Sequence, residues 1–203
     1  MGRKIDYKSF ALFDLFLIII AVLFVIITLL KLETQKGNIT TKAEYVITVT
    51  WPDNDSNDID SWLKDPSGKT CWYRDRDIGL TNLDRDDLGI ANDTYYLGNG
   101  RYFTNPYNQE LTTIRGCIEG EWWFNIHMFR LNNTNGSMVM VKIEKLNPTV
   151  EVVAYQEILL SKPWQEITIA HFRLDKDCEF IFLDNVYKPI AVLMRVQKER
   201  GGD

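Results

Sequence analysis

One carboxylate lies inside an otherwise apolar segment near the N-terminus. Apart from Asp14 and Thr28, every residue from 10 to 30 is apolar. A carboxylate within a membrane-spanning helix is costly, so it usually faces protein, water or an ion path. Asp14 is therefore a candidate carrier of H⁺ or Na⁺. The alternative is a carboxylate close to the membrane edge that extends into water.

A second group of carboxylates could bind a metal ion. The segment from 53 to 60 alternates acids with asparagine and serine, and carboxylate and amide oxygens on a turn are ligands that Ca²⁺ accepts. The candidate ligands are Asp53, Asp55, Asp58 and Asp60. The segment departs from the EF-hand pattern, because its glycine position holds Asp58 and its bidentate acid position holds Lys64. A solvated turn is the alternative. The cluster 84–87, with sequence DRDD, has the same two interpretations, plus internal Asp–Arg pairing.

Catalytic chemistry finds little support in the sequence. The two histidines, His127 and His171, lie in no local nucleophile pattern, and no phosphate-binding loop is present. We therefore expect no enzyme and no catalytic residue. The net charge of −5 argues against nucleic acid as a partner.

The three cysteines, Cys71, Cys117 and Cys178, are widely spaced, which fits neither a zinc site nor a disulfide framework. An exported domain could contain one disulfide, and we expect it between Cys71 and Cys117. Three buried thiols are the alternative.

The apolar segment predicts the element that would position Asp14. Residues 10–32 would form a helix roughly 30 Å long, enough to cross a bilayer. The segment is too long for a signal peptide and is followed by no small-residue cleavage site. We therefore predict a single-pass inner-membrane protein with a cytoplasmic N-terminus (1–9), a linker (33–43) and an exported domain.

The predicted helix also carries a stripe of small and polar residues. Asp14, Ala21 and Thr28 recur every seven residues, and Ile18 and Val25 flank them. Small and hydroxylated residues favour close packing of helices in lipid. We expect this face to meet partner helices, with two copies in contact through Ile18 and Val25.

The remaining sequence predicts an antiparallel β-sandwich over residues 44–197, followed by a polar tail (198–203). Runs of β-branched and aromatic residues alternate with turn-forming residues at short intervals. Residues 75–115 are expected to be a long irregular excursion with short strands, and 190–196 the last strand. The proposed core tryptophans are Trp51, Trp62 and Trp123.

Two parts of the chain resemble known families. Phe13-Asp14-Leu15, after a short basic N-terminus, is similar to the B subunits of ion-driven membrane motors: MotB, ExbD and TolR. That resemblance implies that Asp14 carries the proton or sodium ion. It also implies a homodimer inside a ring of multi-pass MotA/TolQ/ExbB-like subunits.

The second resemblance is to an uncharacterised family of membrane-anchored proteins, and it spans most of residues 44–175. Its most specific segments are 85–89, with sequence RDDLG, and GE-x-x-x-N-x-H over 120–127. The chain lacks an OmpA-like cell-wall-binding pattern and the small α/β domain of ExbD and TolR. We therefore expect a motor B subunit that couples ion flow at Asp14 to mechanical work. The alternative is a membrane-tethered extracytoplasmic binding module for an unknown ligand, with Ca²⁺ as a candidate cofactor and without a motor role.

Overall fold

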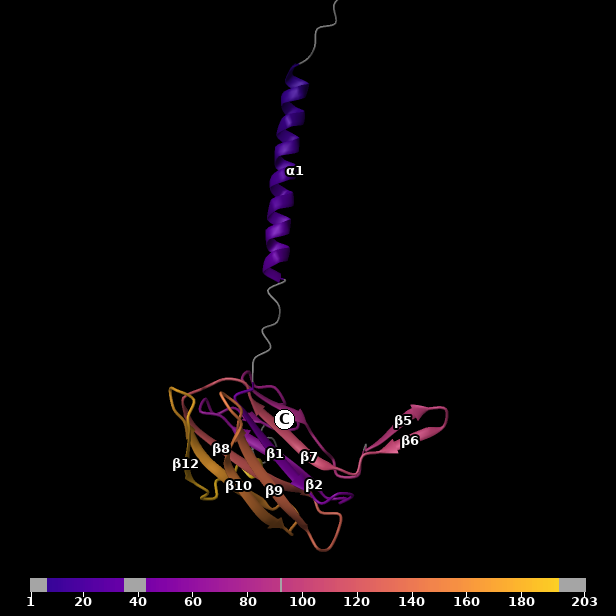
Figure 1. Cartoon of the computed structure of the whole chain (residues 1–203), viewed down its shortest axis with the longest axis vertical. Helices are drawn as coiled ribbons and strands as arrows, with labels where there is room; N and C mark the ends of the chain where they lie inside the picture. Colours follow the sequence, from indigo (N-terminus) through magenta and orange to yellow (C-terminus); the bar gives the residue numbers. More distant parts are fainter. Residues whose placement is uncertain (1–6, 35–42, 92, 194–203) are drawn as a thin grey trace, which may run out of the picture. The chain divides into compact units, whose positions relative to one another are not determined.

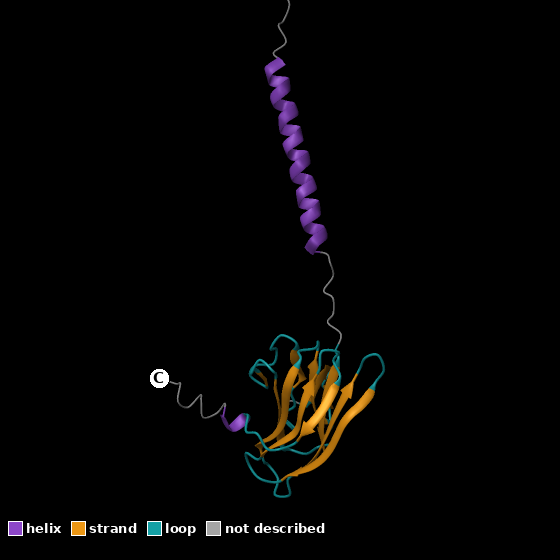
Figure 2. Ribbon diagram, turned by 90° about the vertical axis from the view of Figure 1, so that its left-hand side faces the viewer, coloured by secondary structure: helices purple, strands orange, loops and turns teal. Residues whose placement is uncertain are grey.

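The computed structural model describes residues 7–34, 43–91 and 93–193. The chain divides into two compact units, Met1–Thr40 and Thr41–Asp203. The first contains the helix α1, Tyr7–Thr34, and the strands formed by the described residues all lie in the second (Figures 1 and 2).

The predicted transmembrane helix over 10–32 is wrong. A helix forms there, but within the described part of the chain no helix has the length and apolar character that a bilayer crossing requires. A spanning helix needs about 20 consecutive apolar residues. The same finding corrects the predicted localisation as a single-pass inner-membrane protein with a cytoplasmic N-terminus and an exported domain. It also corrects the fold class, which becomes a mainly β chain with an N-terminal helix.

The second unit is built from two five-stranded antiparallel sheets and a separate two-stranded hairpin. Figure 2 shows the strands of the unit packed in layers, as the sequence predicted for a β-sandwich. The first sheet has the order β10-β9-β1-β7-β4, with bounds Glu151–Leu160, Ser137–Lys145, Tyr45–Trp51, Asn108–Ile114 and Thr81–Arg85. The second has the order β12-β11-β8-β2-β3, with bounds Phe180–Asp184, Glu166–Leu174, Gly120–Arg130, Asp58–Lys64 and Thr70–Cys71. The hairpin consists of β5, Thr94–Gly98, and β6, Arg101–Thr104.

Alternation along the strands explains how the core forms. Successive side chains of a strand point to opposite faces. In β1, every second residue from Tyr45 to Trp51 is buried, while the residues between are partly exposed. In β8 the fully buried apolar residues are Trp122, Phe124, Ile126 and Met128, which belong to the same core cluster.

The three tryptophans proposed for the core have different environments. Trp51 lies in the main core. Trp62 is buried too, but in a separate small cluster with Ile190 and Ala191. Trp123 is only partly buried and packs against that second cluster, so its predicted place in the core is wrong.

Two further sequence predictions are wrong. The expected last strand is replaced by a helical turn over 191–193, and residues 194–203 lie outside the described part of the chain. The disulfide joins Cys117 to Cys178, with a Cα–Cα distance of 5.4 Å, and leaves Cys71 as a buried free thiol. Cys117 follows β7 and Cys178 lies in the β11–β12 turn, so the pairing depends on the arrangement of the sheets, which spacing along the sequence does not reveal.

Candidate metal centre

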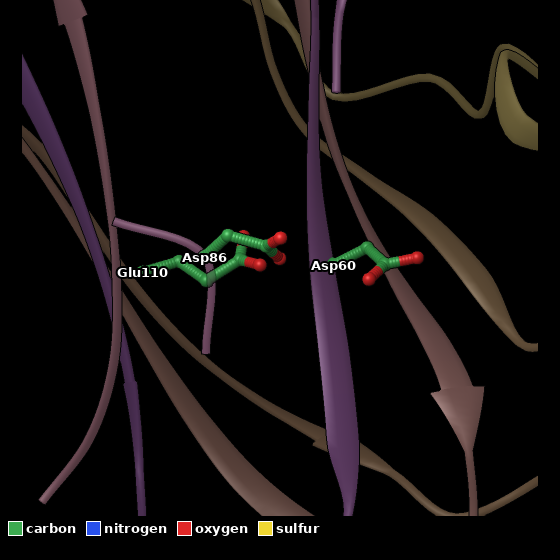
Figure 3. Close-up of side chains that lie close together, drawn as sticks. All are labelled: Asp60, Asp86 and Glu110. Atoms are coloured by element: carbon green, nitrogen blue, oxygen red, sulfur yellow. The ribbon is translucent and has the colours of Figure 1, made fainter. Parts of the chain in front are cut away.

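Three carboxylates from separate elements come together in the second unit. Asp60 lies on β2, Asp86 follows β4, and Glu110 lies on β7. One carboxylate oxygen of each lies within 4.8 Å of the others, which makes these three residues the candidate metal centre among the described residues. Figure 3 shows the carboxyl groups of Asp86 and Glu110 close together beside β2, the strand that carries Asp60.

The free edge of β2 explains the position of Glu110. The short strand β3 pairs with β2 only at Leu63 and Lys64, so no described strand covers the edge of β2 beyond them. The Ser61 backbone N–H donates to Glu110 Oε2 at 2.6 Å. Glu110 lies opposite Val49 on β1 and is fully buried. The Glu110 side chain therefore reaches from the first sheet to the edge of the second. There it accepts the backbone hydrogen bond that a neighbouring strand would otherwise accept.

A hydrogen-bonded turn fixes the position of Asp86. The next carboxylate, Asp87, accepts from the backbone N–H groups of Gly89 and Gln109 at 3.1 Å each. It also pairs with Arg85 at 2.8 Å. These contacts hold the turn between β4 and the start of β7, so Asp86 is carried by a segment attached at both ends.

Burial leaves oxygens of the cluster without hydrogen-bond donors. Asp60 is 2% exposed and Glu110 is 0% exposed. Asp60 Oδ2, Asp86 Oδ1 and Glu110 Oε1 are buried and have no hydrogen-bond partner. Since most buried polar atoms in proteins are hydrogen-bonded, each unpartnered oxygen needs an explanation, such as a bound ion.

Basic groups offset only part of the negative charge. The half-exposed Arg76 approaches Asp86 at 3.9 Å, and Nδ1 of the buried His127 lies 3.6 Å from Asp60 Oδ2. Burial raises the pKa of each of the three carboxyl groups. The neighbouring Asp60 carboxylate raises the pKa of Glu110 further. The cluster therefore favours binding either protons or a cation.

The donor set suits a hard cation such as calcium. All three ligands are carboxylates, and Ca²⁺ takes about 6–8 oxygen ligands in a flexible geometry, whereas Mg²⁺ demands a near-ideal octahedron. The three oxygens lie within 4.8 Å of one another, so they converge on one small region. The alternative is a proton shared between Asp86 and Glu110.

The structure divides the four acids that the sequence predicted as calcium ligands. Asp60 joins the centre, and the buried Asp58 lies two residues before it. Burial, together with the adjacent Asp60 carboxylate, raises the pKa of Asp58 to about 7. Asp53 is exposed. Asp55 accepts hydrogen bonds from Asn57, Asn133 and Ser137, so its carboxylate belongs to a hydrogen-bond network with the segment between β8 and β9 and not to the centre.

The residues predicted for ion transport lie on α1. Asp14, Ile18, Ala21 and Val25 have exposed side chains, and the side chain of Thr28 lies outside the described residues. No observation tests their roles in ion binding or helix packing, which stay predictions.

Glu110 is the centre residue that sequence reasoning missed. It lies in Asn108–Ile114, where buried positions alternate with partly buried ones before three buried residues end the strand. A carboxylate at a core position of a strand is rarely tolerated without a partner. The strand NQELTTI contains few apolar residues, so the sequence offers no local signal that the acid at this position is buried.

Comparisons with known proteins find no matching family model, no matching curated protein and no matching solved structure. The resemblances to motor subunits and to the membrane-anchored family therefore gain no support, and the motor function stays a prediction.

Proposed function

We propose that the β-sandwich is a calcium-binding recognition module in which Asp60, Asp86 and Glu110 bind the ion. The observation that carries the proposal is the set of buried, unpartnered oxygens on all three side chains. A divalent cation would satisfy these oxygens together and offset their charge, while a hydrogen bond from a single donor would satisfy only one.

The origins of the three ligands suggest what the ion would do. Asp60 and Glu110 belong to different sheets, and Asp86 belongs to the turn beyond β4. An ion held by all three would link both layers of the sandwich to that turn. Because it would bind the folded chain and not the unfolded one, it would stabilise the fold and the loops near the centre.

Calcium titration calorimetry on the full chain, after removal of metal with a chelator, tests this function. The key variant is Glu110→Gln, which keeps an acceptor for the Ser61 N–H but loses the charge. We expect wild-type protein to bind Ca²⁺ more tightly than Mg²⁺, and the variant to lose affinity by at least about tenfold, which corresponds to 1.4 kcal/mol. The melting temperature of wild type should rise with Ca²⁺.

The matched control is Asp53→Asn, which removes an exposed acid from the turn that the sequence first suggested. It should leave the calcium affinity unchanged. Asp86→Asn provides a second test at the centre if Glu110→Gln fails to fold. If wild type shows neither a heat of calcium binding nor a rise in melting temperature with calcium, the proposal is contradicted and the shared proton is favoured. An equal loss of affinity in Asp53→Asn would place the site elsewhere.

A further inference from the structure

The hairpin of β5 and β6, residues 94–104, is called the arm here. Its two strands pair with each other and with no other described strand. Figure 1 shows the arm projecting from the strands of the sandwich. Its base is held by backbone hydrogen bonds, from Asn105 N–H to Asp93 O at 3.0 Å and from Asn54 N–H to Pro106 O at 2.9 Å. The arm is thus a projecting element with an ordered attachment.

The arm exposes large side chains on both faces. Tyr95 lies opposite Phe103, and Tyr96 lies opposite Tyr102. Neighbouring residues of a strand point to opposite faces, so the two pairs occupy different faces of the hairpin. Each of these side chains is at least half exposed, as is Leu97 near the turn. So much exposed aromatic surface on one small element is typical of a binding surface.

The edges of the arm are open as well. An isolated two-stranded hairpin is marginally stable in water, and three or more strands are needed for independent stability. Proteins usually protect exposed strand edges with charges, proline or a covering segment. Among residues 94–104 the single charged residue is Arg101, next to the turn, and no proline occurs. The strands β5 and β6 therefore lack the usual protection against pairing with another strand.

The distribution of charge indicates which partner fits. The chain has a net charge of −5, so two copies carry like charge and repel each other overall. Residues 94–109 contain no Asp or Glu. At the arm, two copies can approach without opposing carboxylates. A strand edge can also pair with its own copy about a two-fold axis, since an antiparallel pairing is self-complementary.

We propose that the arm is a self-association surface that pairs edge to edge with the arm of a second copy. Two hairpins then form one four-stranded sheet, which exceeds the strand number needed for a stable sheet. Aromatic side chains of the two copies lie beside each other across the new strand pair and add to its stability. The association goes beyond calcium binding and does not depend on it.

Distance measurement between arms tests the geometry directly. Cys71 is buried and the other two cysteines are bonded, so a spin label attaches selectively to a new surface cysteine. We expect full-length Thr104→Cys, labelled on the arm, to give a short and narrow distance between copies. Lys176→Cys, labelled on the β11–β12 turn, is the control and should give a longer distance. An arm label with no short distance between copies overturns the proposal.

Charge substitutions on the arm test the energetics. Tyr96→Lys combined with Tyr102→Lys places two like charges on one face of each arm and should weaken association at least about tenfold by sedimentation. Tyr155→Lys changes a similarly exposed tyrosine on β10 and should have no effect. A wild-type chain that stays monomeric at every concentration overturns the proposal. Association that survives the arm substitutions, for example through the exposed apolar side chains of α1, also overturns it.

Discussion

Two adjacent tryptophans on β8 have opposite surroundings. Trp122 is fully buried, stacks with Phe172 at 6.1 Å between centroids, and donates its Nε1–H to Ile118 O at 3.2 Å. Trp123 lies on the other face, stacked with His171 at 4.4 Å. The Lys188 ammonium lies 3.1 Å from the centroid of the Trp123 ring. Trp122 therefore belongs to the close-packed core, and Trp123 to an aromatic and cationic contact near the surface.

Truncation should separate their contributions. Trp122→Ala creates a cavity and leaves a buried acceptor without its donor, so we expect it to lower the free energy of unfolding by about 3–5 kcal/mol. Trp123→Ala should cost clearly less, because water can occupy the vacated space. Urea unfolding of both variants beside wild type measures the difference. Equal losses would mean that the two faces of β8 are equally packed.

At the residue scale, the sequence predicts which residues of a strand share a face better than it predicts which face is buried. Because the backbone fixes the period of a strand, Trp123, Asn125 and His127 lie on one face of β8. The sequence does not show which of the two faces packs in the core, since aromatic residues occupy both. In the candidate centre, Asp60 and Asp86 lie in acidic clusters that the sequence shows. Glu110 reaches them only through contact between two sheets, which a local pattern cannot reveal.

At the element scale, the turn after β4 depends on one glycine. Gly89 has φ +69°, and a Cβ built there would lie 2.6 Å from the Asn57 carbonyl oxygen. The close approach keeps the turn against the segment that leads into β2. A side chain at this position would therefore push the turn, and Asp86 with it, away from Asp60.

Alanine substitution should reveal that dependence. Gly89→Ala combines unfavourable φ with a backbone clash, and we expect a lower melting temperature and weaker calcium binding. Gly79→Ala is the matched control, because Gly79 has φ +87° and nothing within 4 Å of the added Cβ. It should cost only about 1–2 kcal/mol for the left-handed conformation and leave calcium affinity unchanged. Equal losses of calcium affinity in both variants would show that the close approach of Gly89 to Asn57 does not position Asp86.

Element prediction succeeds where hydrophobic alternation is clear and fails where polar residues face inward. The runs that form β1, β8 and β11 are evident from β-branched and aromatic residues. The strand β7 lies between β1 and β4, yet its sequence NQELTTI offers few apolar residues. The tyrosines of the arm lie in the segment expected to be an irregular excursion with short strands, and the hairpin holds them exposed. Composition indicates a strand, whereas burial depends on what the rest of the chain places beside it.

At the scale of the whole molecule, regular strand spacing is enough to predict two antiparallel sheets but not their order. The β7–β8 connection runs from one sheet to the other, and the β11–β12 turn joins two strands of the second sheet. The disulfide joins these two connections, through Cys117 and Cys178. The Tyr45 hydroxyl donates to the Cys178 carbonyl oxygen, which attaches the same turn to β1. The covalent bond therefore reinforces contacts between both sheets.

Removal of this disulfide should weaken the whole fold. The linked residues are separated by 61 positions, and a loop of that size gives a loss of about 4 kcal/mol on chain-entropy grounds when the bond is absent. We expect that loss in Cys117→Ser/Cys178→Ser and in reduced wild type, measured by urea unfolding. Burial raises the pKa of the Cys71 thiol to about 12, so this thiol should stay unreactive in the folded chain and not replace the lost bond. Reductant should leave the double variant unchanged, because its remaining cysteine has no disulfide to lose. A further change in the unfolding free energy of the double variant with reductant would show a different disulfide pairing in solution. An unchanged unfolding free energy of fully reduced wild type would show that non-covalent packing alone holds the two connections.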